Sequence, residues 1–507
     1  MTASTQLRVL SLYNASTPQL LATVLFLAAF GFLARIVYNL YFHPLAKYPG
    51  PRLAAATSLV WWYKWITGNT LLHYESAHNQ CGEIVRIAPD RISFTNPQAW
   101  KDIYGHHTGN TKDDSFYGPD FNGRHSLLSI QSDAEHTRVR RIFTHAFSDK
   151  ALRDQEDLIR HHIDKLIKSV HIQAGKGAEM NLVKLYNCTT FDVMADLTFG
   201  EPLGLLDNSE YSPWLESILG GIKFATYQTL MLEYPLLNKL VSLLTPPKVV
   251  EQFKKAFEYS AQRVENRMAK GVTERPDIWS LVLGKEEGKG LDIEDMNANA
   301  SLFMVAGSET TATLLSGLTY HLLLSPEKMS RLVEEIRGTF ADEKDLTIDN
   351  LRRLTYLNAC FEEGLRVYPP APSGLPRTIS KGGSTILGHY FPEKTRVSLP
   401  QWASYRYPAN FTNPLVFAPE RWLPDDPEYP PYAHDNREIL QPFSYGPRNC
   451  IGKNLAYHEM RLILAKTLWH FDLELCPQSR GTWLRQKTWW GLWEKPPLWV
   501  RAKSVRG

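Results

Sequence analysis

The stretch FSYGPRNCIG, Phe443 to Gly452, places a cysteine directly after a Gly-Pro turn and an arginine. Apolar residues recur at helical spacing in the segment that follows, IGKNLAYHEMRLILAKTLWHF, so Cys450 should stand at or just before a helix N-terminus. Unpaired N–H groups and the positive end of a helix dipole favour a thiolate at such a position, and Arg448 adds positive charge. The sequence therefore predicts that the thiol of Cys450 ionises.

An ionised thiol acts either as a nucleophile or as a metal ligand. A nucleophile needs a base and an oxyanion hole, and the sequence carries no signature of either. A zinc site needs further cysteines or histidines at short spacing, whereas the five cysteines are scattered and form no CxxC motif. That odd, scattered set also excludes a disulfide framework and indicates a reducing compartment. A single thiolate in a glycine-flanked loop suits a metal that four other atoms already hold, and haem iron is such a metal.

The same ten residues resemble the haem-binding loop of the cytochrome P450 family, whose pattern is Phe-x-x-Gly-x-Arg-x-Cys-x-Gly. All the fixed positions match, at Phe443, Gly446, Arg448, Cys450 and Gly452. The resemblance implies a mainly α fold, one large helical domain with small β-sheets. It also implies haem b (iron protoporphyrin IX), with Phe443 beside it and Cys450 as the axial thiolate ligand of the iron. The alternative is a buried structural cysteine in a turn.

The segment MVAGSETTATLL lies within Asp295 to Leu324, which is apolar nearly all round and therefore predicts a buried central helix. A buried Glu309-Thr310-Thr311 is unfavourable unless it is paired or faces a wet cavity. The residues alone allow a simpler interpretation, in which the threonines bond to the preceding helical turn and Glu309 reaches an edge. AGSETT, however, is similar to the distal-helix pattern of the same family. The resemblance implies a distortion at Gly307 where dioxygen sits, a hydrogen bond from Thr310 to that oxygen, and proton relay through water by Glu309. It favours a monooxygenase.

A third motif, EEGLRVYPP, places Glu363 and Arg366 three residues apart on one helical face. By itself such a pair is most simply an exposed ion pair worth less than about 1 kcal/mol. ExxR in the cytochrome P450 family is instead an internal ion pair, and FAPERW supplies its third member, Arg421. The resemblance therefore implies a structural network of Glu363, Arg366 and Arg421 that holds the Cys450 loop rigid.

Haem propionates need cations or hydrogen-bond donors. HTRVRRIFTHAFS resembles the family's helix with Trp-x-x-x-Arg: His136 stands where tryptophan is usual, and Arg140 matches the arginine. Arg377 in GLPRT and Arg448 in the cysteine loop fit the remaining propionate partners of the family. The resemblance thus implies that His136, Arg140, Arg377 and Arg448 bind the cofactor's carboxylates.

The N-terminal stretch QLLATVLFLAAFGFLARIVYNLYF has no charged residue from Gln19 to Ala34, which predicts a membrane span of about 20 residues. A cleaved signal peptide is the alternative, but bulky aromatic residues follow where small ones would be needed. Arg35, Lys47 and Arg52 come after the span, and the positive-inside rule then places the bulk of the chain in the cytosol. We expect a single-pass endoplasmic reticulum membrane protein with a lumenal N-terminus, where Asn14 begins a glycosylation sequon.

The proline-rich HPLAKYPGPRLA predicts a stiff, extended hinge. No second linker or repeat follows it, so we expect three parts: 1–42 as lumenal tail and membrane anchor, 43–54 as hinge, and 55–507 as one haem-thiolate catalytic domain. The net charge of +3, without basic stripes, excludes nucleic-acid binding. The predicted elements are a hairpin over 82–95, short strands over 384–399 and in the last 30 residues, and helices over 151–170, 247–270, 295–324, 326–340 and 349–368.

Together these motifs resemble a haem-thiolate monooxygenase. The segments YFHPLAKYPGP and HAFSDKAL are most similar to filamentous-fungal members such as the trichothecene C-15 hydroxylase and pisatin demethylase groups. The resemblance implies insertion of one oxygen atom from O2 into an apolar secondary metabolite, by hydroxylation or epoxidation in one or several steps. Electrons would come from NADPH through a separate FAD- and FMN-containing reductase, with cytochrome b5 as a second donor, because the chain has no GxGxxG motif or flavin domain.

Two other functions remain open from the sequence. One is an electron-independent isomerase or dehydratase on the same scaffold. The other is a membrane-tethered haem sensor or carrier without turnover. Substrate contacts are expected from four segments, 105–129, 203–235, the distal helix before Gly307, and 370–375, with a turn near 489–493 closing the pocket.

Overall fold

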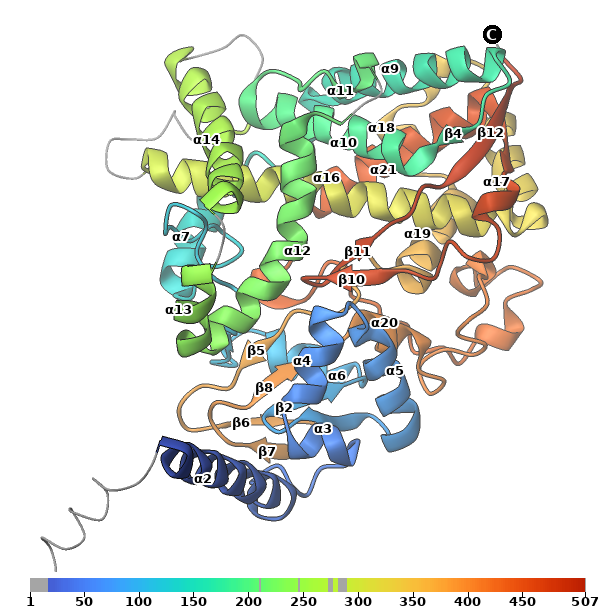
Figure 1. The fold of residues 1–507 in the computed structure, drawn as a ribbon. Coiled ribbons are helices and arrows are strands. Elements are labelled where there is room, and N and C mark those ends of the chain that lie inside the picture. The colour runs from blue at the N-terminus through green and yellow to red at the C-terminus, as the bar shows by residue number, and fades with distance from the viewer. Residues whose placement is uncertain (1–16, 209–210, 245–246, 272–276, 281–289, 507) are drawn as a thin grey trace, which may run out of the picture.

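The computed structural model describes residues 17–208, 211–244, 247–271, 277–280 and 290–506. Helices form most of the body, and small sheets complete it, as the sequence predicted (Figure 1). The long helix α16 (Ile293–Leu323) crosses the middle of the body, and α10 (Leu182–Phe199) packs along it. Side chains on nearly all sides of both helices are buried, which is why neither shows a clear polar face in the sequence.

Most predicted helices are confirmed, and their first turns show the expected capping chemistry. Asp292 accepts a hydrogen bond from the backbone N–H of Asp295 at the start of α16, and Ser132 accepts one from Glu135 at the start of α7. The other helices are α3 (Arg52–Ala56), α4 (Leu59–Ile66), α5 (Thr70–Cys81), α6 (Gln98–Tyr104), α7 (Asp133–Thr144), α8 (Asp149–Asp154), α9 (Glu156–Gly175), α11 (Leu205–Asn208), α12 (Pro213–Glu233), α13 (Pro235–Leu244), α14 (Pro247–Ala269), α17 (Pro326–Thr339), α18 (Ile348–Leu351), α19 (Thr355–Val367), α20 (Gln401–Arg406) and α21 (Lys453–His470).

Two segments predicted as single helices are divided. The segment 151–170 is interrupted at Gln155, between α8 and α9, and in 349–368 α18 ends at Leu351 and α19 begins at Thr355. The carboxylate of Glu335, on α17, accepts hydrogen bonds from the backbone N–H groups of Tyr356 and Leu357 at 2.7 and 2.8 Å. In a continuous helix these N–H groups would bond to carbonyls four residues earlier. Glu335 therefore caps α19 from a neighbouring helix, and no local sequence signal marks that partner.

The largest sheet joins the N-terminal hairpin to strands from the second half of the chain. Its strand order is β1-β2-β8-β5-β3, and the predicted hairpin over 82–95 forms β1 and β2. At the far edge β3 pairs with β5, which places Lys112 directly opposite Arg377. Its strands are β1 (Ile84–Ala88), β2 (Arg91–Phe94), β3 (Thr111–Lys112), β5 (Arg377–Thr378) and β8 (Arg396–Ser398). The smaller sheets pair β4 (Met180–Asn181), β12 (Trp499–Ser504) and β9 (Phe471–Leu475); β6 (Ser384–Ile386) and β7 (His389–Phe391); and β10 (Lys487–Trp489) and β11 (Leu492–Glu494).

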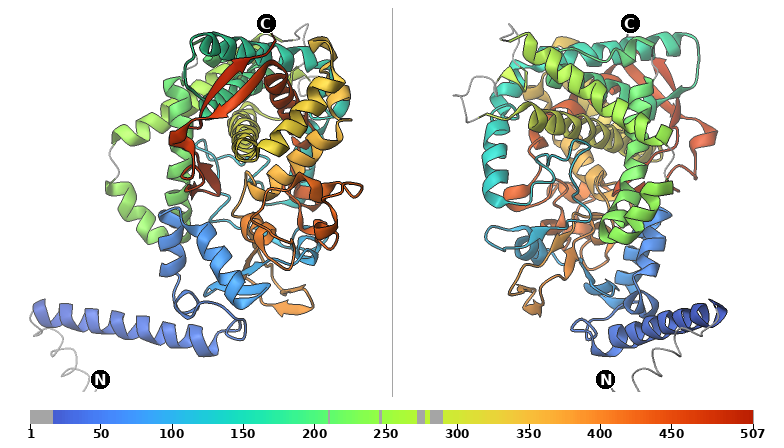
Figure 2. Two further views of the ribbon diagram at one scale, coloured as in Figure 1. Left: turned by 90° about the vertical axis from the view of Figure 1, so that its right-hand side faces the viewer. Right: turned by 60° about the vertical axis from the view of Figure 1, so that its left-hand side comes forward.

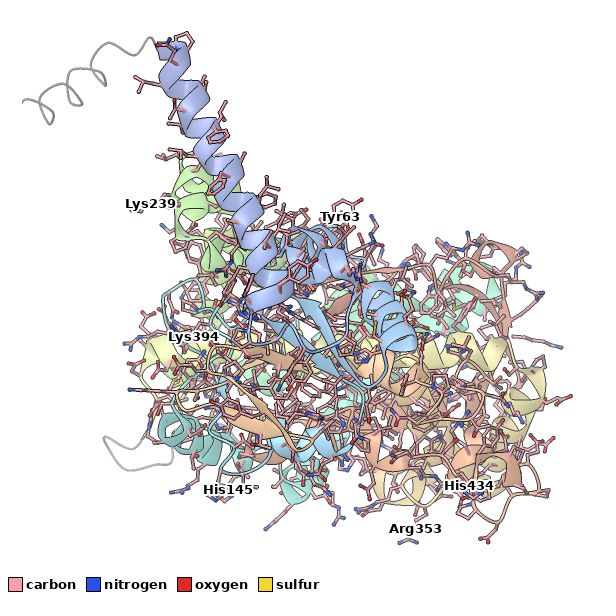
Figure 3. The ribbon with its side chains drawn as sticks, turned by 90° about the horizontal axis from the view of Figure 1, so that it is seen from below. Tyr63, His145, Lys239, Arg353, Lys394 and His434 are labelled. Carbon is pink, nitrogen blue, oxygen red and sulfur yellow. The ribbon has the colours of Figure 1, made fainter. Side chains whose placement is uncertain are left out.

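The N-terminal apolar segment forms α2 (Thr17–Val37), continued by a π-helical turn over Tyr38–Phe42. The helix projects from the lower end of the body in both views of Figure 2. Its candidate span, Pro18–Phe42, is 25 residues long with a mean hydropathy of 2.3, which is enough to cross a membrane and supports a membrane anchor. Figure 3 views this lower face, with Tyr63 and Lys239 labelled in the helices beside α2. The sequon at Asn14 lies outside the described residues.

The segment 43–54 is not the extended hinge that its prolines predicted. It folds into turns and then into α3, which begins at Arg52. Leu45 is fully buried, and the ring of Tyr48 stacks on that of Phe391 with the centroids 4.8 Å apart. The apolar side chains between the prolines thus join the protein core, and their burial outweighs the preference of proline for extended backbone.

Candidate active site

The Cys450 loop is held by a backbone hydrogen bond of its own and by close contact with the backbone of Tyr104. The backbone N–H of Cys450 donates a hydrogen bond to the carbonyl of Phe443 at 2.9 Å, and α21 begins at Lys453. Gly446 has a φ of +73°, and a Cβ there would lie 2.0 Å from the carbonyl oxygen of Tyr104. Only glycine fits this close approach, so the glycine of the motif fixes the path of the loop.

Cys450 faces a large cavity in the middle of the body. The cavity has about 1410 Å³ of space that protein atoms do not fill, part of it open to solvent. Phe443 and Arg448 of the same loop line it, together with Gly307 and Thr310 of α16. Most of the remaining lining is apolar, including Leu127, Phe147, Leu302, Phe303, Leu314, Leu365 and Leu375. The cavity therefore brings the two sequence motifs, around Cys450 and Thr310, to one space.

The thiol of Cys450 is accessible from the cavity, and desolvation by the surrounding protein raises its pKa above the ordinary value. The backbone N–H of Gly452 and the charges of Arg140 and Lys453 lower the pKa by less. This balance is that of the protein alone, and a metal ion bound to a thiol lowers the pKa of that thiol strongly. Ionisation of Cys450 as a metal ligand stays a prediction.

The two threonines of α16 bond within the helix, as the simpler interpretation of the sequence holds. The hydroxyl of Thr310 donates to the carbonyl of Ala306 at 2.7 Å, and that of Thr311 donates to Gly307 at 3.0 Å. The helix runs through Gly307 without a break, so the expected distortion is absent from this described segment. A Cβ at Gly307 would lie 2.6 Å from the sulfur of Met194, so any larger residue here would require the Met194 side chain of α10 to shift.

Glu309 is not among the residues that line the cavity, and its expected role in proton relay through water stays a prediction. Its side chain is buried and forms an ion pair with Lys495, which follows β11. Lys495 also donates a hydrogen bond to the hydroxyl of Thr313 at 2.7 Å. A buried carboxylate is stable only when paired, and Lys495 supplies that pairing. Because 186 residues separate the two partners, no local pattern in the sequence reveals this contact.

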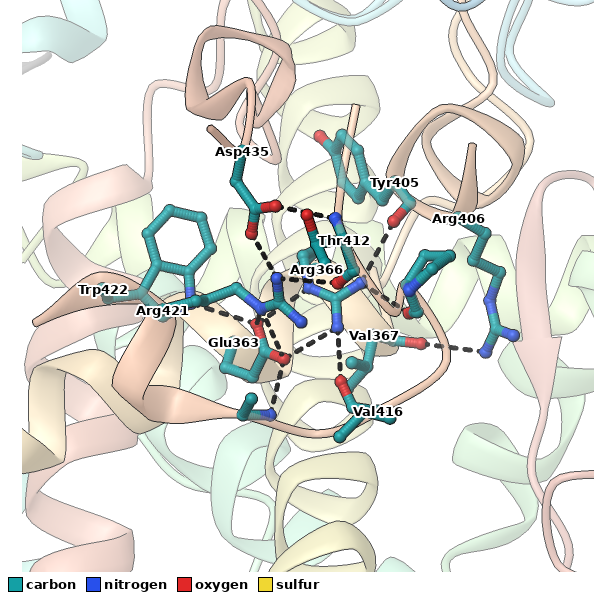
Figure 4. A network of polar contacts seen from close by, with 12 residues as sticks. Glu363, Arg366, Val367, Tyr405, Arg406, Thr412, Val416, Arg421, Trp422 and Asp435 are labelled. Atoms are coloured by element: carbon teal, nitrogen blue, oxygen red, sulfur yellow. Dashed lines mark hydrogen bonds and ion pairs between the residues drawn. The ribbon is translucent and has the colours of Figure 1, made fainter. Parts of the chain in front are cut away.

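Glu363, Arg366 and Arg421 form one fully buried network (Figure 4). The guanidinium of Arg366 donates two hydrogen bonds to the Glu363 carboxylate, at 2.7 and 2.8 Å, and Arg421 donates one at 3.1 Å. The indole of Trp422 and the backbone N–H of Ala418 donate to the same carboxylate. Burial tends to raise the pKa of Glu363, but Arg366 and then Arg421 outweigh it, so the pKa lies below its ordinary value.

The network reaches the cysteine loop through Tyr405. Arg366 donates to the backbone carbonyl of Tyr405 at 3.1 Å, and the hydroxyl of Tyr405 accepts a hydrogen bond from the backbone N–H of Gln441 at 3.0 Å. Gln441 stands two residues before Phe443, where the loop begins. These contacts give a physical route by which the buried ion pairs support the chain around Cys450.

Arg377 lies opposite Lys112 in the sheet, and the other three expected carboxylate-binding residues line the cavity. His136, Arg140 and Arg448 line it, and burial followed by the charges of nearby cations lowers the pKa of His136 to about 3. Arg448 donates to the backbone carbonyls of Ile130 and Gln131 and to Asp133, and Arg140 donates to Asn449. The side chain of Arg377 is buried, and its Nη1 has no hydrogen-bond partner within the described ranges.

Lys112 is a cavity residue that the sequence gave no reason to select. Its side chain is 4% exposed and lines the same cavity as Cys450. No sequence motif surrounds Lys112. The observation that marks it is its strand pairing with Arg377, an expected carboxylate-binding residue far along the chain.

The cavity lining also tests the expected substrate contacts. Three of the four segments contribute: Leu127 and Leu128 come from 105–129, Leu302 and Ala306 from α16, and Leu375 from 370–375. None of the described residues of 203–235 lines it. The turn near 489–493 is also absent from the lining. Trp490 stacks instead on Phe116, with the ring centroids 5.2 Å apart.

The residues present fit an iron porphyrin. Such a group needs one axial ligand, an apolar space for its ring, and cations or donors for its two carboxylates. Cys450, the apolar lining and the cluster of positive side chains with the unpartnered Nη1 of Arg377 meet these needs.

Comparison with known proteins agrees with this arrangement. The model of the family described as Cytochrome P450 matches residues 49–498. The chain is 48% identical to Cytochrome P450 monooxygenase FUM2 of Gibberella moniliformis, over 93% of this chain and 100% of that protein. It is 46% identical to Cytochrome P450 monooxygenase AMT3 of Alternaria alternata, over 93% and 96% of the two chains. It is 40% identical to the averantin hydroxylase of Dothistroma septosporum, over 92% and 88%.

Proposed function

This chain belongs to the cytochrome P450 family as one of its monooxygenases, and from that premise we propose that it inserts one oxygen atom from O2 into an apolar secondary metabolite. The reaction would be a hydroxylation or an epoxidation, in one or several steps. An apolar cavity that contains both Cys450 and Thr310 is the observation that carries this proposal.

Four side chains of the cavity have roles in the proposed reaction. Bound haem, with Cys450 as its thiolate ligand, supplies oxygen activation. Phe303 and Leu375 hold an apolar substrate and exclude water from it. Thr310 keeps its hydroxyl proton on the cavity wall by bonding to Ala306, and rotation of its side chain would present that proton to the reacting centre.

A cytochrome P450 receives electrons from a redox partner, and we propose that the donor here is an NADPH-dependent reductase carrying FAD and FMN, with cytochrome b5 as a second donor. A polar cavity with about 970 Å³ of space that protein atoms do not fill, part of it open to solvent, supports a docking place beside the cysteine loop. Asn449 and the exposed Lys453 line it, together with His106. The positive charge of Lys453 would complement an acidic reductase surface.

We also propose the division of the chain into a lumenal tail and anchor (1–42), a connecting segment (43–54) and a cytosolic catalytic domain (55–507), held in the endoplasmic reticulum membrane. The exposed apolar span of α2 supports the anchor. Arg35 lies in the last turn of α2, Lys47 and Arg52 follow the span, and these three charges support the cytosolic side for the remainder.

Labelled oxygen tests the proposed reaction. The purified chain is reconstituted in lipid vesicles with a fungal NADPH–cytochrome P450 reductase and given the apolar metabolite extract of its source organism under 18O2. We expect a product that contains one 18O atom and that requires both NADPH and the reductase, identified by mass spectrometry. A product formed without either would favour the isomerase or dehydratase, and the absence of any product alongside tight haem binding would favour the carrier.

Thr310→Ala tests the role of the distal threonine with the same substrate. Because a positioned proton donor contributes at least about a hundredfold in many reactions, we expect product per NADPH to fall by about tenfold or more while hydrogen peroxide rises. Thr319→Ala is the matched control, since Thr319 lies on the same helix and bonds to the hydroxyl of Tyr186 away from the cavity. Equal yields of product from the two variants would contradict the role of Thr310.

Removal of residues 1–37, which leaves the buried Asn39 in place, tests the anchor. We expect the shortened chain to leave microsomal membranes for the soluble fraction while retaining its haem spectrum, because α2 is exposed along nearly all of its length. Fractionation followed by immunoblotting measures the change. Retention of the shortened chain on carbonate-washed membranes would show that another surface holds the protein there.

A further inference from the structure

We propose that Lys112 and Tyr117 join Arg377 in binding one carboxylate of the haem. These three residues, rather than Arg140 and Arg448, then contribute most of the binding to that carboxylate. The inference rests on the proposed function, because it takes haem as the bound group. It adds two residues that no motif of the chain identifies.

The pairing of β3 with β5 places two buried cations opposite each other, an arrangement that an anion would stabilise. Lys112 and Arg377 are direct cross-strand partners, and each is only 4% exposed. Like charges directly opposite each other destabilise a sheet, and a buried cation without a counter-ion is unfavourable by itself. Burial and then the charge of Arg377 lower the pKa of Lys112 well below its ordinary value, which reflects the same conflict.

The described protein offers no free carboxylate to resolve this conflict. Asp133, the acid that raises the pKa of Lys112, has a side chain 86% exposed and bonds to Arg448. Asp113, the next residue along the chain, is buried but pairs with Arg396 at 2.8 Å. An acceptor from outside the described part of the chain would resolve the conflict.

The donors that remain free lie together. The ammonium group of Lys112 has one hydrogen-bond partner among the described residues, the carbonyl of Leu128, and two of its N–H groups remain available. It also lies over the ring of Tyr117, 4.9 Å from the centroid. The hydroxyl of Tyr117 and the Nη1 of Arg377 are buried and have no hydrogen-bond partner in the described part of the chain.

The other two arginines differ from this group. Arg448 donates to two backbone carbonyls and to Asp133, and Arg140 donates to both the carbonyl and the side chain of Asn449. These bonds fix the two arginines to the protein and leave fewer donors for a ligand. A carboxylate has about four acceptor positions, enough to take hydrogen bonds from an ammonium, a guanidinium and a phenol together.

The haem is the occupant that the cavity favours, since Lys112 and Cys450 line the same space. A carboxylate on the substrate would have the same chemistry, so the experiment must separate the two sources.

The rate of haem transfer from the holoenzyme to excess apomyoglobin, followed by absorbance, measures how tightly the protein holds the cofactor. We expect Lys112→Met to lose haem about 10- to 100-fold faster than the wild type, the range that corresponds to one buried charge-assisted hydrogen bond. Lys112→Arg, which keeps the charge, should stay within about threefold, and Tyr117→Phe should fall between them. Lys101→Met, at an exposed lysine of α6, is the control and should match the wild type.

Two further arms identify the carboxylate. Reconstitution with haem dimethyl ester, which lacks free carboxylates, should abolish the difference between the wild type and Lys112→Met. If the difference persists with the ester, or if free haem is lost equally fast from both proteins, the proposal is overturned. Laurate serves as the probe for a substrate carboxylate, and its binding is measured by the spectral shift that it causes. If Lys112→Met lost haem at the wild-type rate but bound laurate more weakly, Lys112 would instead bind a substrate carboxylate, and the proposal would be overturned.

The reduced carbon-monoxide spectrum keeps this proposal separate from the proposed function. A thiolate-type Soret band in the wild type and in every variant shows that the haem-thiolate centre is intact, whatever the rate of haem loss. A wild type without that band would contradict the proposed function itself.

Discussion

Cys450→Ala should abolish both the thiolate-type Soret band of the reduced carbon-monoxide complex and the monooxygenase activity, while the protein remains folded. The loop should keep its path, because the bond from residue 450 to the carbonyl of Phe443 is made by the backbone N–H and survives the substitution. The close approach of Gly446 to Tyr104 is also unaffected. Difference spectroscopy measures the first change and circular dichroism checks the fold.

The expectation is strong because no other thiol can replace this one. Cys188, Cys360 and Cys476 are buried, Cys81 is half-buried, and none of these four lines the cavity. Cys360→Ala is the matched control: burial raises the pKa of Cys360 well above its ordinary value, so it stays a thiol and its loss should leave the Soret band in place. A thiolate-type band that persisted in Cys450→Ala would exclude Cys450 as the iron ligand.

The sequence predicted the features that depend on neighbouring residues. The central helix α16, the hairpin over 82–95 and the turn before Cys450 follow from local spacing and from proline and glycine, and the structure has all three. The turn residues and helical periodicity act within a few positions, so one segment contains the whole signal.

The sequence failed where distant residues decide the outcome. Lys495 pairs with Glu309, and Lys112 lies opposite Arg377. Glu335 binds the start of α19 and so divides the helix over 349–368. In each case the partners lie far apart in the sequence. Such contacts arise only when the fold brings the partners together, and a single sequence records neither partner's position.

Desolvation of Cys450 is a further property that the sequence does not show. The sequence displays the groups that favour a thiolate, a helix that follows and Arg448 nearby, but not the surrounding protein that raises the pKa of the thiol. The same limit applies to the ion pair of Glu363 and Arg366, whose three-residue spacing is equally compatible with an exposed pair. Burial is what distinguishes the two cases.

Arg366→Met should destabilise the protein by about 3–5 kcal/mol, because it leaves the Glu363 carboxylate buried with only part of its counter-charge. The substitution also removes donors from the carbonyls of Tyr405, Pro414 and Val416, to which Arg366 bonds at 3.1, 2.7 and 2.8 Å. Chemical denaturation of the holoprotein, followed by loss of the Soret band and of helical circular dichroism, measures the effect.

Lys254→Met is the matched control for that loss of a cation. Lys254 pairs with Glu258 on the surface, with both side chains more than half exposed, and such pairs contribute less than about 1 kcal/mol. Equal midpoints for Arg366→Met and the wild type would show that the buried network adds nothing to stability, and would remove its proposed support of the Cys450 loop.

The pH dependence of stability provides an independent measure of the same network. The pKa of Glu363 is lowered in the folded protein, so its ion pairs stabilise the fold at pH values above the ordinary pKa of a glutamate. That stability is lost as the pH falls through the lowered pKa, because the unfolded chain then binds a proton more readily than the folded one. Glu363→Gln should therefore be less stable than the wild type at neutral pH, and its stability should fall less steeply on acidification. If the two proteins lost stability in parallel from neutral to acidic pH, Glu363 would not be the carboxylate whose ionisation the fold depends on.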